Sequence, residues 1–127
     1  MSDTQWHRVC TVDQLETDLG EAALFGTEQI AVFKAWDGNV YTVSNIDPRT
    51  DQGVMSRGIV GDRMVDGARR PTISSPLYKE VYDLGTGVCH TSDHFGLAVY
   101  TNRVVDGVVQ VDLASRTDAR ARALPRH

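Results

Sequence analysis

The densest group of side chains able to do chemistry lies in the heptapeptide CHTSDHF, residues 89–95. It combines a thiol, two imidazoles and a carboxylate, which are donor types that bind zinc. These groups belong to Cys89, His90, Asp93 and His94. The two histidines are four apart, as on one helix face, but the segment follows a Thr-Gly turn and lacks the glutamate of a zinc-protease helix. We therefore predict a surface loop with solvated histidines, and a zinc site is the alternative.

The serine and cysteine side chains give a weaker indication of a catalytic site. Ser74 and Ser75 are adjacent, but no G-x-S-x-G elbow surrounds them and no local residue is an obvious base. Backbone capping is the more natural role for them. Cys10 and Cys89 are the only cysteines, and their separation rules out a CxxC motif. The sequence therefore predicts two free thiols.

Short strands joined by tight turns must position these residues. Two hairpins are predicted where runs of β-branched and aromatic residues flank an Asp-Gly dipeptide, which readily takes the positive φ angles of a type I′ turn. The runs are residues 29–36 and 39–45 around Asp37-Gly38, and residues 97–105 and 108–113 around Asp106-Gly107. A third dipeptide, Asp66-Gly67, predicts a shorter hairpin between them.

Helical periodicity is poor throughout the chain. The best stretch, residues 11–25, is interrupted by Gly20, so we predict about one turn after Asp13 and then a strand over residues 22–25. The fold class that follows is all-β and antiparallel, as a small sandwich or a partly open barrel.

The chain reads as one domain with a tail. Residues 1–113 form the predicted domain, and residues 114–127 form a flexible basic tail with four arginines and one aspartate. The alternative for the tail is a short helix over residues 118–124. Since the net charge is −4 and the tail carries +3, the domain carries −7.

Composition excludes several function classes. The chain has 127 residues, of which 41% are hydrophobic and 24% charged, as in ordinary globular proteins. An acidic domain does not suit nucleic acid, whose phosphates need a basic face. No apolar run approaches the roughly 20 residues of a membrane span, and the start does not resemble a secretory signal. We expect a cytoplasmic protein with no membrane partner.

Two loops have the layout of a metal-binding pair, but not its ligands. The stretches VSNIDP, SRGIVGD and SSPLYKEVYDLGTG occur in that order between the predicted strands. This layout resembles a Rieske domain, in which C-x-H ends one hairpin and C-x-x-H opens the next. The resemblance covers roughly residues 5–113. At the four ligand positions this chain has Asn45, Asp47, Ser75 and Tyr78.

A Rieske cluster needs two thiolates on one iron and two imidazoles on the other. Asn45 and Ser75 cannot supply thiolates, and a lone carboxylate at Asp47 does not hold such a cluster. We therefore expect no cofactor or metal on this chain. Asp47 should accept backbone N–H groups in an Asx turn, and the Tyr78 ring should fill part of the space that a cluster would take.

Three segments carry a narrower resemblance, residues 45–48, 56–62 and 75–79. Together they are similar to the small subunit of cytoplasmic NAD(P)H-dependent nitrite reductase, a clusterless Rieske-like family. The resemblance implies a non-catalytic subunit in nitrate assimilation. It supports a large subunit that carries FAD, an iron–sulfur centre and sirohaem and reduces nitrite to ammonium. The alternative is a Rieske-type [2Fe-2S] ferredoxin of an oxygenase. The candidate partner surface consists of Asp47, Pro48, Arg57, Tyr78 and Lys79.

Overall fold

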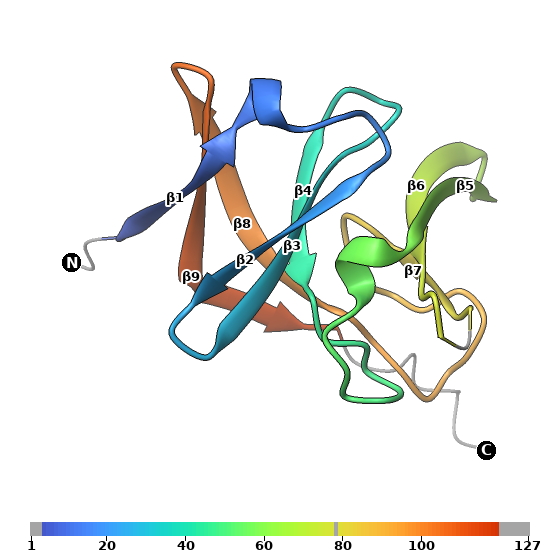
Figure 1. Ribbon diagram of the computed structural model, residues 1–127. Coiled ribbons are helices and arrows are strands. Elements are labelled where there is room, and N and C mark those ends of the chain that lie inside the picture. Colours follow the sequence, from blue (N-terminus) through green and yellow to red (C-terminus); the bar gives the residue numbers. More distant parts are fainter. Residues whose placement is uncertain (1–3, 78, 120–127) are drawn as a thin grey trace.

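The computed structural model describes residues 4–77 and 79–119, which form two antiparallel sheets (Figure 1). The larger sheet has the strand order β1-β9-β8-β4-β3-β2. Its strands are β1 (Trp6–Thr11), β2 (Gly20–Phe25), β3 (Glu28–Lys34), β4 (Val40–Ser44), β8 (Ala98–Val105) and β9 (Val108–Asp118). The smaller sheet has the order β5-β6-β7, with β5 (Ile59–Val65), β6 (Ala68–Ser74) and β7 (Val81–Asp83).

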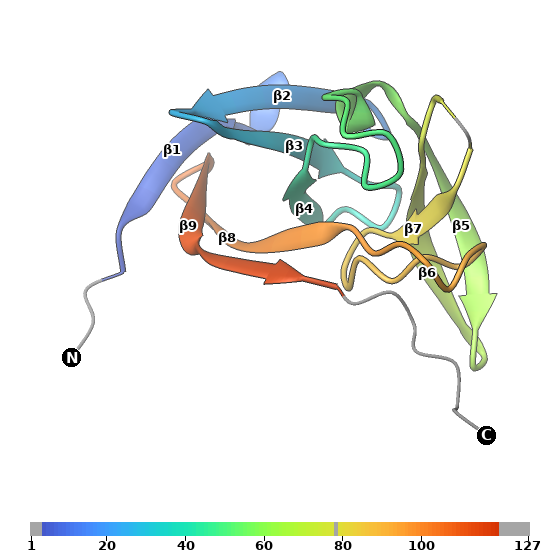
Figure 2. The ribbon, with the colours of Figure 1, turned by 90° about the horizontal axis from the view of Figure 1, so that it is seen from below.

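The larger sheet curls into a nearly closed barrel, and the smaller sheet stands at one end of it (Figure 2). Two short 3₁₀-helices, η1 (Val12–Gln14) and η2 (Met55–Arg57), are the only helices among the described residues. The predicted all-β fold, built from hairpins as a partly open barrel, is confirmed. The single turn predicted after Asp13 corresponds to η1.

Strand β3 lies between two cores, which explains its uninterrupted apolar run. Ile30 and Val32 point into the barrel, while Ala31 and Phe33 face the smaller sheet. All four side chains are fully buried. Burial of each large aliphatic or aromatic side chain contributes about 1.5–3 kcal/mol. A strand buried on both faces loses the alternation of a half-exposed strand, so β3 ties the two cores together.

The Asp-Gly turns follow the sequence prediction at two of three places. Asp66-Gly67 and Asp106-Gly107 have positive φ at both residues, as a type I′ turn requires. In Asp37-Gly38 only the glycine does, and the Ala35 carbonyl accepts the Gly38 N–H at 2.8 Å. The type I′ prediction was therefore wrong there. The Asp37 carboxylate instead accepts the Asn39 N–H at 3.0 Å, which favours a longer connection.

The folded part continues past the predicted boundary at Leu113, because β9 runs to Asp118. Ser115 Oγ accepts the Thr101 N–H at 2.7 Å, and Arg116 Nη1 donates to the Tyr100 hydroxyl at 3.1 Å. These cross-strand bonds hold a segment whose polar sequence does not look like a strand. The prediction of a tail from residue 114 was wrong for residues 114–118, and residues 120–127 lie outside the described residues.

Trp36 joins the barrel to the smaller sheet. Its Nε1 donates to the Gly61 carbonyl at 2.9 Å, and the Arg69 guanidinium lies 3.8 Å from the centre of its ring. A stacked guanidinium gains from the ring quadrupole as well as from dispersion. The side chain is half-buried.

Candidate functional site

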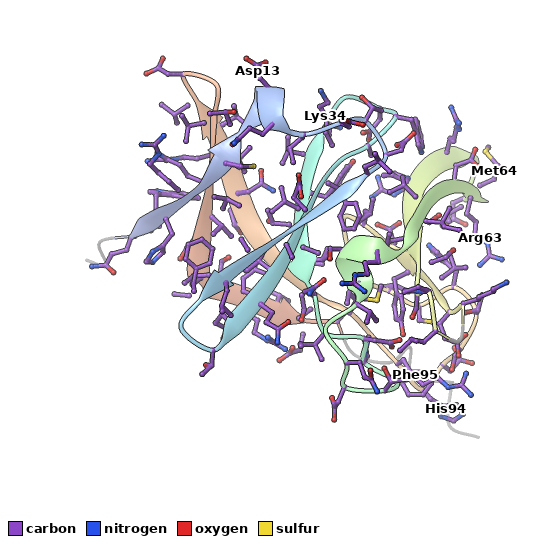
Figure 3. All side chains as sticks on the ribbon, in the orientation of Figure 1. Asp13, Lys34, Arg63, Met64, His94 and Phe95 are labelled. Atoms are coloured by element: carbon purple, nitrogen blue, oxygen red, sulfur yellow. The ribbon has the colours of Figure 1, made fainter. Side chains whose placement is uncertain are left out.

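Three loops gather at one end of the molecule, beside the smaller sheet (Figure 1). They are residues 45–54 after β4, residues 75–80 between β6 and β7, and residues 89–95 before β8; we call them together the tip. Residue 78 lies outside the described residues. Phe95 and His94 lie at the tip, whereas Met64 lies on the β5–β6 hairpin away from it (Figure 3). The two loops predicted to share a ligand site do meet here.

Asp47 and Ser75 join the first two loops directly. The Ser75 hydroxyl donates to Asp47 Oδ2 at 2.5 Å, and the two side chains are 0% and 1% exposed. Asp47 Oδ1 accepts the Arg49 N–H at 2.9 Å, which is the predicted Asx turn. A hydrogen bond to a buried carboxylate is short and about twice as strong as a neutral one. Two loops that are 28 positions apart are therefore tied by a protein hydrogen bond at the predicted ligand positions.

Asn45 holds the start of the first loop against η2. Its Oδ1 accepts the Ser56 N–H at 2.7 Å, and its backbone carbonyl accepts the Met55 N–H at 2.9 Å. Gly53 lies so close that an added Cβ would be 2.3 Å from Gln29 Oε1. A side chain at residue 53 would have to displace the end of the Gln29 side chain.

A second set of contacts ties in the third loop. Glu80 Oε2 accepts from Arg49 Nη1 at 2.9 Å, and Glu80 Oε1 accepts from the Thr91 hydroxyl at 2.5 Å. The Arg49 guanidinium also lies 5.9 Å from the centre of the Phe95 ring. Glu80, with a 12% exposed side chain, is thus shared by all three loops, and the tip is one connected unit.

Asp83, the last residue of β7, forms a second cluster of hydrogen bonds next to the tip, which we call the Asp83 anchor. Arg70 donates to its two oxygens at 3.0 and 2.9 Å, and the Gly85 and Thr86 N–H groups donate to Oδ1 at 2.8 and 2.9 Å. Burial pushes the pKa of Asp83 upward, but the hydrogen bonds from Arg70, Thr86 and Gly85 outweigh it and hold that pKa below its usual range. The sequence analysis missed this pair, which the aspartate of the YDLGTG turn could have suggested.

Tyr82, which precedes Asp83 in β7, has a buried hydroxyl. The side chain is 0% exposed, and within the described residues its oxygen has no hydrogen-bond partner. Burial, with the nearby Cys89, Asp47 and Glu80, raises the pKa of Tyr82, so the hydroxyl stays neutral. A buried hydroxyl without a partner costs stability.

Replacing Tyr82 with phenylalanine should therefore raise the free energy of unfolding by about 1 kcal/mol. The matched control is Tyr41→Phe, because the Tyr41 hydroxyl donates to Asp37 Oδ2 at 2.6 Å and its loss should lower stability slightly. Urea unfolding of both variants makes the comparison. A clear loss of stability in Tyr82→Phe would contradict the conclusion that the buried Tyr82 hydroxyl lacks a hydrogen-bond partner.

The segment predicted as a surface loop with metal-capable side chains has an irregular structure, without the helix that would align its histidines. Cys89 is 1% exposed and lies under the loop. His90 Nε2 lies 3.7 Å from Asp83 Oδ2, so His90 belongs to the Asp83 anchor and is not solvated. His94 is exposed as predicted. Within residues 4–77 and 79–119, no three His, Cys, Asp or Glu side chains converge as metal ligands would. Both cysteines are free thiols.

The side chains at the ligand positions do not fit a Rieske cluster. The described donors are an amide, a carboxylate and a hydroxyl, whereas the cluster takes thiolates and imidazoles. The amide oxygen of Asn45 already accepts from Ser56, and Asp47 and Ser75 are in direct contact with each other. No step of the function is therefore derived through such a cluster.

The predicted partner surface needs one correction. Asp47 is fully buried and cannot contact a partner through its side chain, because it faces Ser75. Arg57 and Lys79 are exposed and Pro48 is half-exposed, so they can contribute. Tyr78 lies outside the described residues. The structure adds Leu77, an apolar side chain that is 43% exposed beside Lys79.

Comparison with known proteins gives a consistent result. The family model described as Rieske-like [2Fe-2S] domain matches residues 5–112. The nitrite reductase (NADH) small subunit of Escherichia coli K12 is 35% identical over 109 residues, which are 85% of this chain and 97% of that protein. The solution structure of the nitrite reductase [NAD(P)H] small subunit from Erwinia carotovora has a TM-score of 0.71 at 34% identity and covers 98% of this chain and 94% of its own.

Two further similarities bear on the alternatives. A segment of the Klebsiella oxytoca nitrite reductase [NAD(P)H] large subunit is 35% identical over 82 residues, which are 65% of this chain and 8% of that protein. A ferredoxin from Sphingomonas yanoikuyae has a TM-score of 0.68 at 21% identity, covering 85% of this chain and 98% of its own. At that identity the similarity shows a shared fold alone.

Proposed function

This chain belongs to the Rieske-like [2Fe-2S] domain family and, within it, to the nitrite reductase small subunits, and from that membership we propose that it is an accessory subunit of an NAD(P)H-dependent nitrite reductase. Its partner is the large subunit of that enzyme. The observation that carries the role is the Asp47–Ser75 bond, because it gives the tip a fixed shape from protein atoms alone.

The match to a large subunit supports this partner. In Klebsiella oxytoca a segment similar to this chain lies within the large polypeptide itself. A domain that can be joined covalently to a partner in one organism works beside that partner at a fixed ratio. We therefore infer one copy of this chain for each large subunit.

The chain should carry no iron–sulfur cluster, because its ligand positions are occupied by groups that bind one another. The cofactors of the reaction, FAD, an iron–sulfur centre and sirohaem, would then all be on the large subunit, in the cytoplasm. The part of the chain that the structure describes holds no helix with the length and hydropathy of a membrane span. No catalytic residue is assigned to this chain.

The tip would serve as part of the docking surface. Its accessible groups are the half-exposed Pro48 and the exposed Arg57, Leu77 and Lys79, and the buried Asp47 supports the loop without touching the partner. A rigid loop surface loses little conformational entropy on binding, which favours association.

Reconstitution tests this function. Nitrite-dependent NADH oxidation by the large subunit should rise, or last longer, when an equimolar amount of this chain is added. The chain alone should show none of this activity and no absorbance in the visible region. If the added chain changed neither the rate nor the duration of NADH oxidation by the large subunit, the proposal would be contradicted. A coloured chain that exchanges electrons with a reductase would favour the ferredoxin alternative.

A further inference from the structure

The two sheets present four edges, and β2 has the least of the usual protection. The helix η2 packs against its start and the centre of the His7 ring lies 5.6 Å from the centre of the Phe25 ring at its end, while a hollow lies along its middle, at Ala22–Leu24. Native proteins guard free edges with charges, proline, bulges or very short strands. Edge strand β1 has a bulge between Arg8 and Cys10, β7 has three residues, and β5 carries Asp62 and Arg63. β2 has six residues in uninterrupted register with β3, no proline, and Glu21 as its only charge.

Hydrogen bonding places free backbone groups on the outer side of β2. The Gln29 carbonyl of β3 accepts the Asn45 N–H at 2.9 Å, so the Gln29 backbone points toward β4. Its partner across the ladder is Leu24. In an antiparallel ladder the backbone groups of such a residue point away from the neighbouring strand. Leu24 and, by alternation, Ala22 therefore present their N–H and C=O groups outward.

A hollow of about 360 Å³ lies along this edge, lined by Ala22, Ala23, Leu24, Gln29 and Asn45. The side chain of Leu24 is 69% exposed at its rim. Asn45 is also the first residue of the first tip loop, so the hollow reaches the start of that loop. Small side chains beside a free edge leave room for the alternate side chains of an added strand.

Charge indicates what kind of strand would bind. Residues 9–33 contain five carboxylates and no lysine, arginine or histidine. Among the described residues, Asp13, Glu16 and Glu21 are in no ion pair. A second copy would bring like charges together, whereas a basic segment would complement them.

We propose that the outer edge of β2 binds an extended, basic segment of the large subunit, which adds to the barrel sheet as a further strand. This inference rests on the proposed function, because it names where and how the same partner is held. Main-chain hydrogen bonds would supply affinity, and the hollow would select the side chains.

Two variants should prevent strand addition at the outer edge of β2 and leave the hydrogen bonds between β2 and β3 in place. Ala22→Pro deletes an outward N–H, and Leu24→Lys places a guarding charge on the edge. Each should weaken binding to the large subunit about tenfold or more, as loss of a central contact does. The matched control is Met64→Lys, which alters a side chain of similar exposure (65%) on the edge of the other sheet and should change binding less than about twofold.

Hydrogen exchange in the intact complex gives an independent reading. The Ala22 and Leu24 amides should exchange rapidly in the isolated chain and at least about tenfold more slowly in the complex. Wild-type affinity in both variants, or unprotected amides, would overturn the β2 assignment alone. Failure of the wild-type chain to bind the large subunit would overturn the proposed function as well. If the Ala22 and Leu24 amides of the isolated chain became protected as its concentration was raised, the β2 edge would bind a second copy of the chain, and the assignment to the large subunit would be overturned.

Discussion

Replacing Asp47 with alanine is expected to lower the free energy of unfolding by about 3 kcal/mol, because a buried carboxylate with two hydrogen bonds is lost. The Ser75 hydroxyl and the Arg49 N–H would each be left in a buried or half-buried site without their acceptor. Binding to the large subunit should fall too, since the first tip loop loses its tie to the second. Urea unfolding and affinity for the large subunit measure the two effects.

A double-mutant cycle makes this prediction specific. Ser75→Ala alone should cost less than Asp47→Ala, because Asp47 keeps its bond to Arg49. The double variant should be more stable than the sum of the single losses predicts, by about 1–2 kcal/mol. Additive losses would show that the 2.5 Å contact does not couple the loops, and the account of the tip would then be wrong.

Replacing Asp83 with alanine should cost a similar amount, about 3 kcal/mol, because the Arg70 guanidinium loses its partner beside two unpaired N–H groups. The matched control is Asp62→Ala. Asp62 pairs with Arg69 at 2.6 Å on the neighbouring strands, but both side chains are at least half exposed, so the loss should be at most about 0.5–1 kcal/mol.

The difference in stability between wild type and Asp83→Ala should also depend on pH. Because the pKa of Asp83 is lower in the folded chain than in the unfolded one, the ionised carboxylate stabilises the fold above the unfolded value of about 3.9. That contribution is lost as the pH falls through the folded pKa. The gap between wild type and Asp83→Ala should be constant near neutrality and narrow below about pH 4. A gap that widens in acid would contradict the assigned sign.

Local signals explain what could be predicted from sequence. The strands and two of the three Asp-Gly turns depend on neighbouring residues, so the patterns placed them correctly. The order of the loops led to the assigned ligand positions Asn45, Asp47 and Ser75, and the structure brings Asp47 and Ser75 into contact. The end of β9 escaped prediction because Ser115 and Arg116 are held by distant strands, not by their own propensity.

The contacts within the site could not be predicted, because they join residues far apart in sequence. The Asp47–Ser75 and Arg70–Asp83 pairs are 28 and 13 positions apart. Sequence placed Asp47 at the correct loop but on the surface, since charged residues are almost never fully buried without a partner. The partner was Ser75, and only the fold brings it close.

Iron and acid-labile sulfide in the anaerobically purified chain test the central claim most directly. If Asp47 and Ser75 close the tip in place of a metal centre, both contents should be close to zero and the protein should be colourless. About two irons and two sulfides per chain, the content of a [2Fe-2S] centre, with visible absorbance that bleaches on reduction, would contradict it.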